Sequence, residues 1–595
     1  MGNMVGREHT APGELWYPPR PMNALDEQAA RWLADDPDPA TRDALGALLA
    51  AGAGGHPELA DCFAGALVFG TAGLRGLLGP GPNRMNRAMV RRTTAAVAEV
   101  LVGRVPGAAK RGVVVGYDGR RMSREFAEDA ARVLAGQGLV AHLFDAQGPT
   151  PLTAFALRHL EAAGAVMITA SHNPPAYNGY KLYWEHGAQI VSPLDVEIAA
   201  AMAALPGVSD LPLPTLEEAR VAGRVRAVPE AVVGAYLEGV RAMALHPGEG
   251  SPLKIAYTAL HGVGDALATA VLGRFGEVRS VPEQAQPDGA FPTVNFPNPE
   301  EPGAMDRVFA LGSSIRADLV LANDPDADRL AAAIPLPGGG FRALTGNEVG
   351  VLLGHYLLTE GPALGRPMVA TSIVSSPLLG RIAHDLGADY AETLTGFKWI
   401  MHRSAELAAA TGARFVFGYE EALGYCAGEL VRDKDGISAA YLLAELASTL
   451  KARGQTLAHR LDEIARRHGL YLSGQHTETL PGADGAAAIA ARMAQLRGMT
   501  VAELDGRQVV ERADYLRGVV EGRGVERPTG LPPSDVLRFD LHDGARVMVR
   551  PSGTEPKIKY YFDQRGEVGP DGSLDAARER AATQLRGLMT AFLAL

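Results

Sequence analysis

The sequence predicts an α/β protein of several domains, with three similar α/β units in tandem followed by a more mixed α+β segment. Short apolar stretches alternate with Ala-rich stretches of helical spacing, which is the pattern of α/β domains with largely parallel sheets. Three predicted strands, at 163–168, 317–322 and 413–418, run directly into loops dense in polar residues. Open α/β sheets bind ligands at the carboxyl ends of their strands, so these loops are candidate functional sites.

Length and composition set limits on what the chain can be. Its 595 residues suffice for several domains, and 47% hydrophobic residues suffice for ordinary cores. The net charge of −11 argues against nucleic-acid binding, although local basic loops can still bind an anionic substrate. Cys62 and Cys426 cannot form a disulfide framework. Neither a signal-peptide pattern nor an apolar run of about 18 residues is present, so we expect a cytoplasmic protein without membrane contact.

The predicted elements follow one another in a clear order. Residues 26–50 have helical spacing broken by Asp-Pro, which indicates a helical prefix over 1–60. A linker-like stretch at 205–219 is predicted to separate the first unit from the second. After about Leu470 the pattern becomes mixed α+β. Three further strands are predicted ahead of the three named above, at 112–120, 254–262 and 368–376.

The first polar loop, Thr169–Pro175, carries a candidate nucleophile. Ser171 follows a strand in a tight polar turn, which exposes its hydroxyl to a substrate. His172 is adjacent, although adjacency in sequence does not guarantee a hydrogen bond. For a lone Ser-His pair, a plain Asn-Pro turn without a catalytic role is the favoured alternative.

The second polar loop carries three carboxylates at alternate positions, Asp324, Asp326 and Asp328. Carboxylates held together repel one another, and a hard divalent cation relieves the repulsion. A calcium helix-loop-helix site is excluded, because Arg329 stands where that loop needs Gly and Pro335 where it needs Glu. Ligands that are all oxygen favour Mg²⁺ over Zn²⁺. A solvated acidic turn is disfavoured because the cluster directly follows an apolar strand.

The last polar loop predicts phosphate binding. An Arg supplies a bidentate fork, and Ser, Thr and a Gly backbone supply neutral donors. A hairpin loop that is simply polar is the alternative. The residues concerned are Arg550, Ser552, Gly553, Thr554 and Lys557.

The third loop, Tyr419–Gly424, is less informative. Glu420 and Glu421 follow a strand and could accept hydrogen bonds from sugar hydroxyls. A Glu pair at the start of a helix is an equal alternative.

Together and in this order, the four loops resemble the α-D-phosphohexomutase superfamily. The resemblance covers nearly all of the chain from about Phe69. Its most specific stretches are "TASHNPPAYNGYK", "DPDADR" and "RPSGTEP". "FGTAGLRG", "YTALHGVG" and "TLTGFKWI" are similar to the subgroup of cytosolic phosphoglucomutases and phosphopentomutases.

The resemblance implies four domains around a central cleft, namely three similar α/β domains with mixed sheets and a C-terminal α+β phosphate-binding domain. After the prefix 1–60 we expect a phosphoserine domain at 61–225, a metal-binding domain at 226–343, a sugar-binding domain at 344–470 and the phosphate-binding domain at 471–595.

The resemblance also implies roles for individual residues. Ser171 carries the phosphate, and Mg²⁺ is held by the three aspartates and a phosphoserine oxygen. Lys181 is the general acid/base, with a pKa that cations such as Arg329 would lower. The remaining implied residues are His172 and Arg75 near the phosphoserine, Lys398 near the reacting sugar, and Arg329, Glu420, Arg550, Ser552, Gly553, Thr554 and Lys557 as substrate contacts.

The implied activity is a mutase that interconverts sugar 1-phosphates and 6-phosphates, with glucose as the main sugar and pentose 1- and 5-phosphates also possible. Glucose 1,6-bisphosphate would be the activator, and small sugar phosphates the partners of a monomer or dimer. A phosphomannomutase, a sugar-1,6-bisphosphate synthase, a phosphatase and a non-catalytic sensor are the alternatives. One departure concerns the sugar: many relatives read Gly-Glu-x-Ser-Gly, where this chain has Tyr419 and Ala422.

Overall fold

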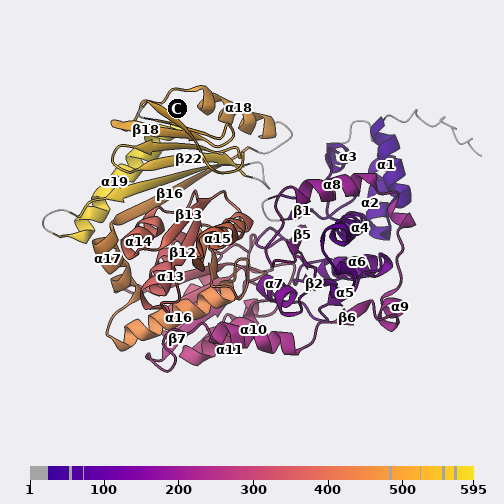
Figure 1. Ribbon diagram of the computed structural model, residues 1–595, viewed down its shortest axis with the longest axis horizontal. Helices are drawn as coiled ribbons and strands as arrows, with labels where there is room; N and C mark the ends of the chain where they lie inside the picture. The colour runs from indigo at the N-terminus through magenta and orange to yellow at the C-terminus, as the bar shows by residue number, and fades with distance from the viewer. Residues whose placement is uncertain are drawn as a thin grey trace, which may run out of the picture.

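The computed structural model describes residues 24–51, 57–70, 73–480, 485–522, 524–552, 557–568 and 572–595. Their strands form four sheets that succeed one another along the chain. The first sheet lies in a lobe of its own, and the other three lie together in a second lobe (Figure 1). This architecture confirms the predicted fold class of three α/β domains and a C-terminal α+β domain.

The first three sheets share one topology. A central strand lies between two parallel neighbours, and a fourth strand runs antiparallel beside the later neighbour. In order along the chain, these strands are β2 (Val113–Tyr117), β3 (Ala141–Leu143), β4 (Gly164–Ile168) and β5 (Tyr177–Trp184); β7 (Leu253–Thr258), β8 (Gly276–Ser280), β9 (Leu319–Asn323) and β10 (Leu330–Pro335); and β12 (Pro367–Ser372), β13 (Asp389–Thr393), β14 (Arg414–Glu420) and β15 (Gly424–Ala427).

Three additional strands extend these sheets. β1 (Leu74–Leu77) pairs with β5, β11 (Phe341–Ala343) pairs with β10, and β6 (Val225–Ala227) pairs with β3. The prediction that 205–219 separates the first two units was therefore wrong, because the chain returns to the first sheet after it. We propose the end of the first domain just after Ala227.

Helices cover the sheets of the first three domains. Several begin at residues that cap a helix N-terminus. Thr345 and Glu348 form a reciprocal cap, and the Asp435 side chain accepts hydrogen bonds from two backbone N–H groups. The helices of these domains are α4 (Arg87–Arg104), α5 (Ala108–Arg111), α6 (Ser123–Gly136), α7 (Thr150–His159), α8 (Leu194–Ala204), α9 (Leu216–Val221), α10 (Ala231–Arg241), α11 (Asp265–Leu272), α12 (Asp306–Ile315), α13 (Gly346–Glu360), α14 (Leu378–Leu386), α15 (Phe397–Thr411), α16 (Gly436–Ala452) and α17 (Leu457–His468).

One hydrophobic core runs through the first three domains without interruption. It joins Phe155 of α7, Tyr236 of α10, Tyr257 of β7 and Tyr441 of α16. A continuous core resists relative displacement of its parts, because side chains in it are close-packed. Within the described part of the chain, no helix is long and apolar enough to cross a membrane.

The fourth domain is an antiparallel sheet with helices on one face. Its strands are β16 (Leu470–Thr479), β17 (Glu503–Leu504), β18 (Arg507–Asp514), β19 (Val519–Gly522), β20 (Val525–Pro528), β21 (Leu537–Leu541), β22 (Arg546–Pro551) and β23 (Lys557–Gly566). α18 (Gly485–Gly498) and α19 (Leu574–Leu593) cover one face with an apolar core. On the other face, Met548 and Tyr561 pack against Val374 and Leu394 of the third domain.

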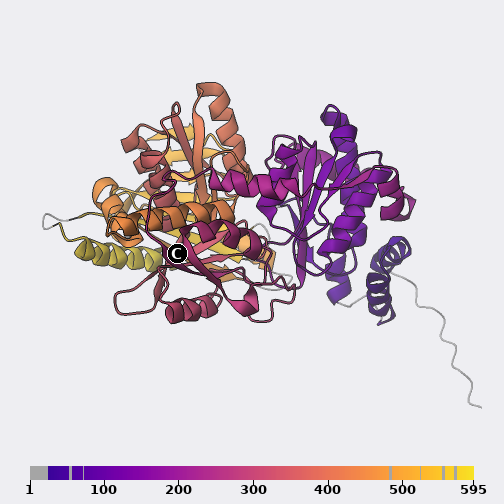
Figure 2. The ribbon, with the colours of Figure 1, turned by 90° about the horizontal axis from the view of Figure 1, so that it is seen from below.

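The prefix forms a small helical unit on the outer side of the first domain (Figure 2). Its helices, α1 (Ala24–Asp35), α2 (Pro39–Ala50) and α3 (Pro57–Cys62), enclose a separate apolar cluster around Leu45 and Leu59. Polar contacts fix it to the domain. The Asp35 carboxylate accepts hydrogen bonds from the N–H groups of Val208 (2.7 Å) and Ser209 (2.9 Å) and from the Ser209 hydroxyl (3.0 Å).

We expect Asp35→Ala to loosen the prefix, because two backbone N–H groups lose a charged acceptor. Each such bond contributes about 1.5–3 kcal/mol, an upper figure here because Asp35 is only half-buried. Hydrogen exchange in α1 and α2 should accelerate, whereas Asp43→Ala on the exposed side of α2 should not change it.

The same contact has a pH dependence of known sign. Burial would raise the pKa of Asp35, but the hydrogen bonds from Ser209 and Val208 outweigh it and lower the pKa. The stabilisation is thus present at neutral pH and lost as the pH falls through that lowered pKa. Equal exchange rates in the Asp35→Ala variant and the wild type would contradict the prediction.

Candidate active site

The three polar loops occupy equivalent places in the three α/β domains. Each connects the third strand of the shared topology to the antiparallel fourth: Ser171 lies between β4 and β5, the aspartates between β9 and β10, and Glu421 between β14 and β15. The fourth domain adds Arg550 at the end of β22. Repetition of one topology therefore brings three different chemistries to one place.

A single cleft is lined by residues of all four domains. Of the predicted site residues, those that line it are Arg75, Ser171, His172, Asp328, Arg329, Glu420, Arg550 and Ser552. Asp324, Asp326 and Lys181 lie fully buried beside it. Lys398 and Lys557 are not among its described lining residues, and Gly553 and Thr554 lie outside the described part of the chain.

The Ser171 loop is held in a defined conformation. Ser171 has a left-handed backbone with φ of 52°, and its N–H donates to the Thr169 hydroxyl at 2.8 Å. Arg120, from the loop after β2, is buried and paired with Asp118 at 3.4 Å. Its guanidinium donates to the carbonyl oxygens of Ser171, Asn173, Pro174 and Tyr177. Arg120 was not predicted, because it lies 51 residues from Ser171 and a lone Asp-Gly-Arg carries no signal.

The Ser171 hydroxyl faces the aspartate loop. Its Oγ donates to Asp324 Oδ2 at 2.6 Å and lies 3.3 Å from His172 Nδ1. Burial, with Arg329 and Arg75 nearby, lowers the pKa of His172 well below its ordinary value. His172 is therefore neutral at pH 7, and one of its ring nitrogens can accept a proton.

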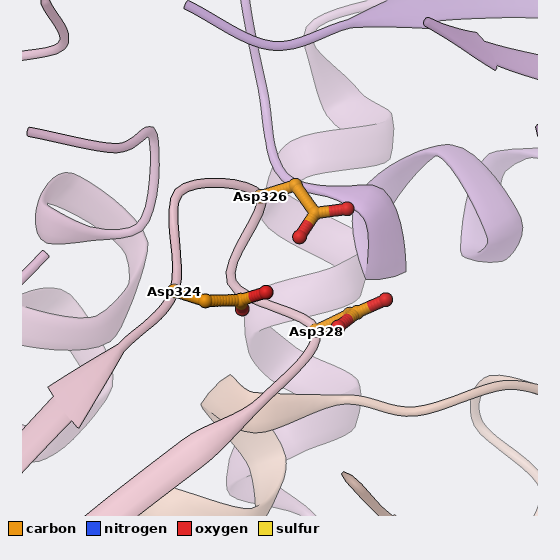
Figure 3. A group of neighbouring side chains, drawn as sticks. All are labelled: Asp324, Asp326 and Asp328. Carbon is orange, nitrogen blue, oxygen red and sulfur yellow. The ribbon is translucent and has the colours of Figure 1, made fainter. Parts of the chain in front are cut away.

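The three aspartate side chains project from one loop and lie close together (Figure 3). Asp324 Oδ2 accepts from Ser171, and Asp324 Oδ1 from the Arg329 N–H at 3.0 Å. Asp326 Oδ2 accepts from Lys181 at 2.7 Å, and Asp328 Oδ2 from Lys181 at 2.6 Å. Among the described residues, nothing donates to Asp326 Oδ1 or Asp328 Oδ1, although both are buried.

This arrangement fits a hard divalent cation. One oxygen from each aspartate lies within 4.8 Å of the others, and the donors are all oxygen. Burial and the carboxylates of Asp326 and Asp328 raise the pKa of Asp324 to about 8. A nearby divalent cation would oppose this shift and favour the ionised form of Asp324. The triad could hold Mg²⁺ through its two unpartnered oxygens and Asp324.

Lys181 differs from the expectation for it. The Asp326 and Asp328 carboxylates outweigh the effect of its burial and raise its pKa. The expected lowering by Arg329 was wrong, because the ammonium lies between two carboxylates and not against the guanidinium. Lys181 therefore acts here as a buried counterion behind the aspartates.

The structure brings two unpredicted ammonium groups to the cleft, Lys434 and Lys559. Lys434 Nζ lies 3.2 Å from Asp328 Oδ2. The methylene stem of Lys434 packs against Gly424. A Cβ added to that glycine would lie 2.3 Å from the stem, so a larger residue there would collide with Lys434. Asp328, Asp433 and Glu420 outweigh its burial and raise its pKa, so it is a fixed cation.

Lys559 could have been found from strand alternation. It pairs with Arg550 across β22 and β23, so both side chains leave the same face of the sheet. No comparable sequence pattern marks Lys434, because it lies in an irregular segment after the third loop, Tyr419–Gly424. Lys398 donates instead to the Gly70 carbonyl at 3.2 Å, which ties the third domain to the first.

The third loop presents two carboxylates to the cleft. Glu420 accepts from the Gly396 N–H at 2.7 Å. Glu421 accepts from the hydroxyls of Ser372 (3.1 Å), the last residue of β12, and Ser375 (3.3 Å), in the loop after it. Ala422 also lines the cleft and leaves no polar group there.

A buried serine hydroxyl beside three carboxylates that could hold a divalent cation, in a cleft that Arg550 and Lys559 also line, is an arrangement suited to phosphoryl transfer. The sequence matches the phosphoglucomutase/phosphomannomutase family in all four of its domains. The α/β/α domains I, II and III match residues 66–206, 234–337 and 345–468, and the C-terminal domain matches 489–568. The chain belongs to this family, the α-D-phosphohexomutases, and is a phosphomutase, an isomerase that acts by intramolecular phosphoryl transfer.

Relatives that are named for activity on different sugars have comparable sequence identity to this chain. A Haemophilus influenzae protein named "Probable phosphomannomutase" is 40% identical over 82% of this chain and 94% of its own length. A human phosphopentomutase is 35% identical over 95% of each chain. A Staphylococcus epidermidis phosphoglucomutase is 34% identical over 83% of this chain and 90% of its own. A Thermus thermophilus structure, provisionally named a phosphomannomutase, superposes with a TM-score of 0.64 at 25% identity, covering 89% of this chain and 99% of that one.

We expect Asp326→Asn to weaken Mg²⁺ binding by about tenfold or more and to slow turnover while the fold survives, since the amide keeps the size but loses the charge. Calorimetric titration with Mg²⁺ measures the affinity. Asp318→Asn, just before β9 at its opposite end, serves as the matched control and should bind normally. A wild-type rate that EDTA leaves untouched would refute the metal site.

Proposed function

We propose that this protein interconverts sugar 1-phosphates and sugar 6-phosphates, with glucose as the main sugar, through a phosphoserine at Ser171 and a sugar bisphosphate intermediate. One observation carries this assignment. The Ser171 hydroxyl lies 2.6 Å from a carboxylate oxygen of the aspartate triad, in a cleft that Arg550 and Lys559 also line. The serine and the triad suit phosphoryl transfer, and the two basic residues suit a phosphate that is held without reaction.

The proposed first step moves the phosphoryl group from Ser171 to the free hydroxyl of a sugar monophosphate. The bond between the sugar oxygen and phosphorus forms as the bond between Ser171 Oγ and phosphorus breaks. The attacking hydroxyl gives its proton to neutral His172, which lines the same cleft and passes the proton to the departing Ser171 Oγ, so the products are a sugar bisphosphate and free serine. After the bisphosphate turns around, the reverse transfer from its other end restores the phosphoserine.

Charge neutralisation supports this transfer. Bound Mg²⁺ would supply Lewis-acid stabilisation of charge on the phosphoryl oxygens, held by Asp324, Asp326 and Asp328. Arg329 and Lys434 line the cleft beside the aspartates and offer positive charge to the same oxygens. Arg550 and Ser552 would hold the phosphate that does not react. Either phosphate of glucose 1,6-bisphosphate could be the one held there.

Proton movement at Ser171 is assigned to His172. Neutral His172 lies 3.3 Å from Ser171 Oγ, within reach of a proton that the serine must release when it attacks and recover when it leaves. The raised pKa of Lys181 and its position between two carboxylates favour a supporting role for it. In this proposal Lys181 orients the aspartates and does not exchange a proton with the sugar.

A pentose activity alongside the hexose activity is also proposed. Ala422 stands where many hexose enzymes of the family have a serine, so one hydroxyl contact to the sugar is absent. The human relative is named a phosphopentomutase, which supports the same extension. The enzyme should thus turn over glucose 1-phosphate and also accept ribose 1-phosphate.

We expect Ser171→Ala to abolish nearly all mutase activity, because it removes the covalent carrier. A coupled assay with glucose 1-phosphate measures the rate, and intact-mass analysis should find a phosphate on the wild type that maps to Ser171. Ser313→Ala, on the exposed side of α12, is the control and should remain active. Full activity in the Ser171→Ala variant would overturn the assignment, and accumulation of free phosphate would indicate a phosphatase.

We expect Ala422→Ser to shift the ratio of kcat/KM values toward glucose 1-phosphate by about two- to tenfold, because one neutral hydrogen bond contributes roughly 0.5–1.5 kcal/mol. The comparison uses glucose and ribose 1-phosphates with the same coupled readout. If the wild type rejects pentose phosphates by several orders of magnitude, this loop does not set the preference.

A further inference from the structure

The first turn of α7 reaches across to the aspartate loop of the second domain. Thr150 is the first residue of α7, and Pro149 occupies the capping position before it. At this position Thr150 does not cap its own helix. Its hydroxyl instead donates to Asp326 Oδ2 at 2.6 Å, and its backbone N–H donates to the Asp326 carbonyl at 2.9 Å.

The first domain thus supplies a donor to the same oxygen of each aspartate. Ser171 donates to Asp324 Oδ2, Thr150 and Lys181 to Asp326 Oδ2, and Lys181 to Asp328 Oδ2. All of these groups are almost fully buried. A carboxylate whose Oδ2 is held by two donors cannot rotate freely about its last bond. Its Oδ1 then points in one direction. Asp326 Oδ1 is one of the two buried oxygens of the triad that have no donor among the described residues.

We propose that Thr150 is a positioning residue for the metal site, one that fixes the Asp326 carboxylate so that Oδ1 faces the cation. This inference rests on the proposed magnesium site. The Thr150 hydroxyl is neutral, so it orients the carboxylate without cancelling the negative charge that attracts the metal. Lys181 also orients the carboxylate, but its positive charge cancels part of that negative charge. Partners of this kind, one step removed from a metal, typically change affinity by about 10–100-fold when lost.

Packing alone is the competing explanation for a buried threonine at this place. Thr150 is completely buried, and α7 contributes to the shared core. Valine has nearly the shape of threonine without its hydroxyl, so Thr150→Val preserves packing and removes the donor. Thr153, one turn along the same helix and equally buried, bonds only weakly to the Met167 sulfur at 3.4 Å. Thr153→Val is therefore a matched control.

The experiment measures Mg²⁺ binding to the full-length protein by calorimetry, together with the Mg²⁺ concentration that half-saturates the rise in Tm. We expect Thr150→Val to raise the Kd by about tenfold, with Thr150→Ser and Thr153→Val close to the wild type. KM for glucose 1-phosphate at saturating Mg²⁺ should be nearly unchanged, because Thr150 does not line the cleft among its described residues.

Each outcome decides a separate question. If Thr150→Val binds Mg²⁺ like the wild type, the positioning role is wrong. If Thr153→Val or Thr150→Ser weakens binding as much as Thr150→Val, the effect belongs to helix packing, and the hydroxyl has no special part. If the wild type itself shows no Mg²⁺ binding, the proposed metal site fails before Thr150 is considered. A Thr150→Val protein that does not fold leaves the Thr150→Ser comparison, in which loss of binding also overturns the proposal.

Discussion

The structure depends on the neutralisation of three buried carboxylates in one loop. Asp324, Asp326 and Asp328 are removed from water at the end of β9, and a buried charge without a partner costs several kcal/mol. Their counterions come from three domains: Lys181 from the first, Arg329 from the second and Lys434 from the third. Because no single domain holds enough positive charge, the aspartate loop is satisfied only when the three domains are assembled around it. The continuous core that joins these domains keeps that assembly in place.

A second regularity follows from the repeated topology. In each α/β domain, the loop after the first strand supports the polar loop after the third. Arg120 holds the carbonyls around Ser171, and Ser372 and Ser375 hold Glu421. In the second domain, the Val263 N–H donates to the Pro325 carbonyl, and Gly262 leaves room for that proline. Parallel neighbours end at the same edge of a sheet, so this support is built into the strand order and needs only suitable residues in the supporting loop.

The sequence predicted the elements whose signals are local. Three of the polar loops follow an apolar strand directly, so the strand pattern alone was enough to place Ser171, the aspartates and Glu420 at strand ends. Residues that act from a distance in sequence were missed. Nothing near Arg120, Thr150 or Lys434 along the chain connects these residues with the loops that they contact. Lys181 was recognised, but its pKa direction was wrong, because the two carboxylates on either side of it became neighbours only on folding. The stretch at 205–219 resembled a linker because its prolines interrupt the helix pattern, yet the short edge strand β6 follows it.

The proposed mechanism also explains where selectivity among sugars must arise. A sugar bisphosphate presents nearly the same group at each end. In the proposed mechanism one end meets Ser171 and the aspartates, and the other end meets Arg550, Ser552 and Lys559. Either end of the bisphosphate can therefore enter either side, which lets one cleft serve both half-reactions. Such phosphate contacts cannot distinguish a hexose from a pentose, because both carry the same phosphate. In this proposal, discrimination is left to other residues that line the cleft, among them Glu420, Glu421 and the apolar Ala422. Two oriented carboxylates and one missing hydroxyl are a modest set of contacts, and differences of one hydrogen bond among them amount to factors of about ten or less.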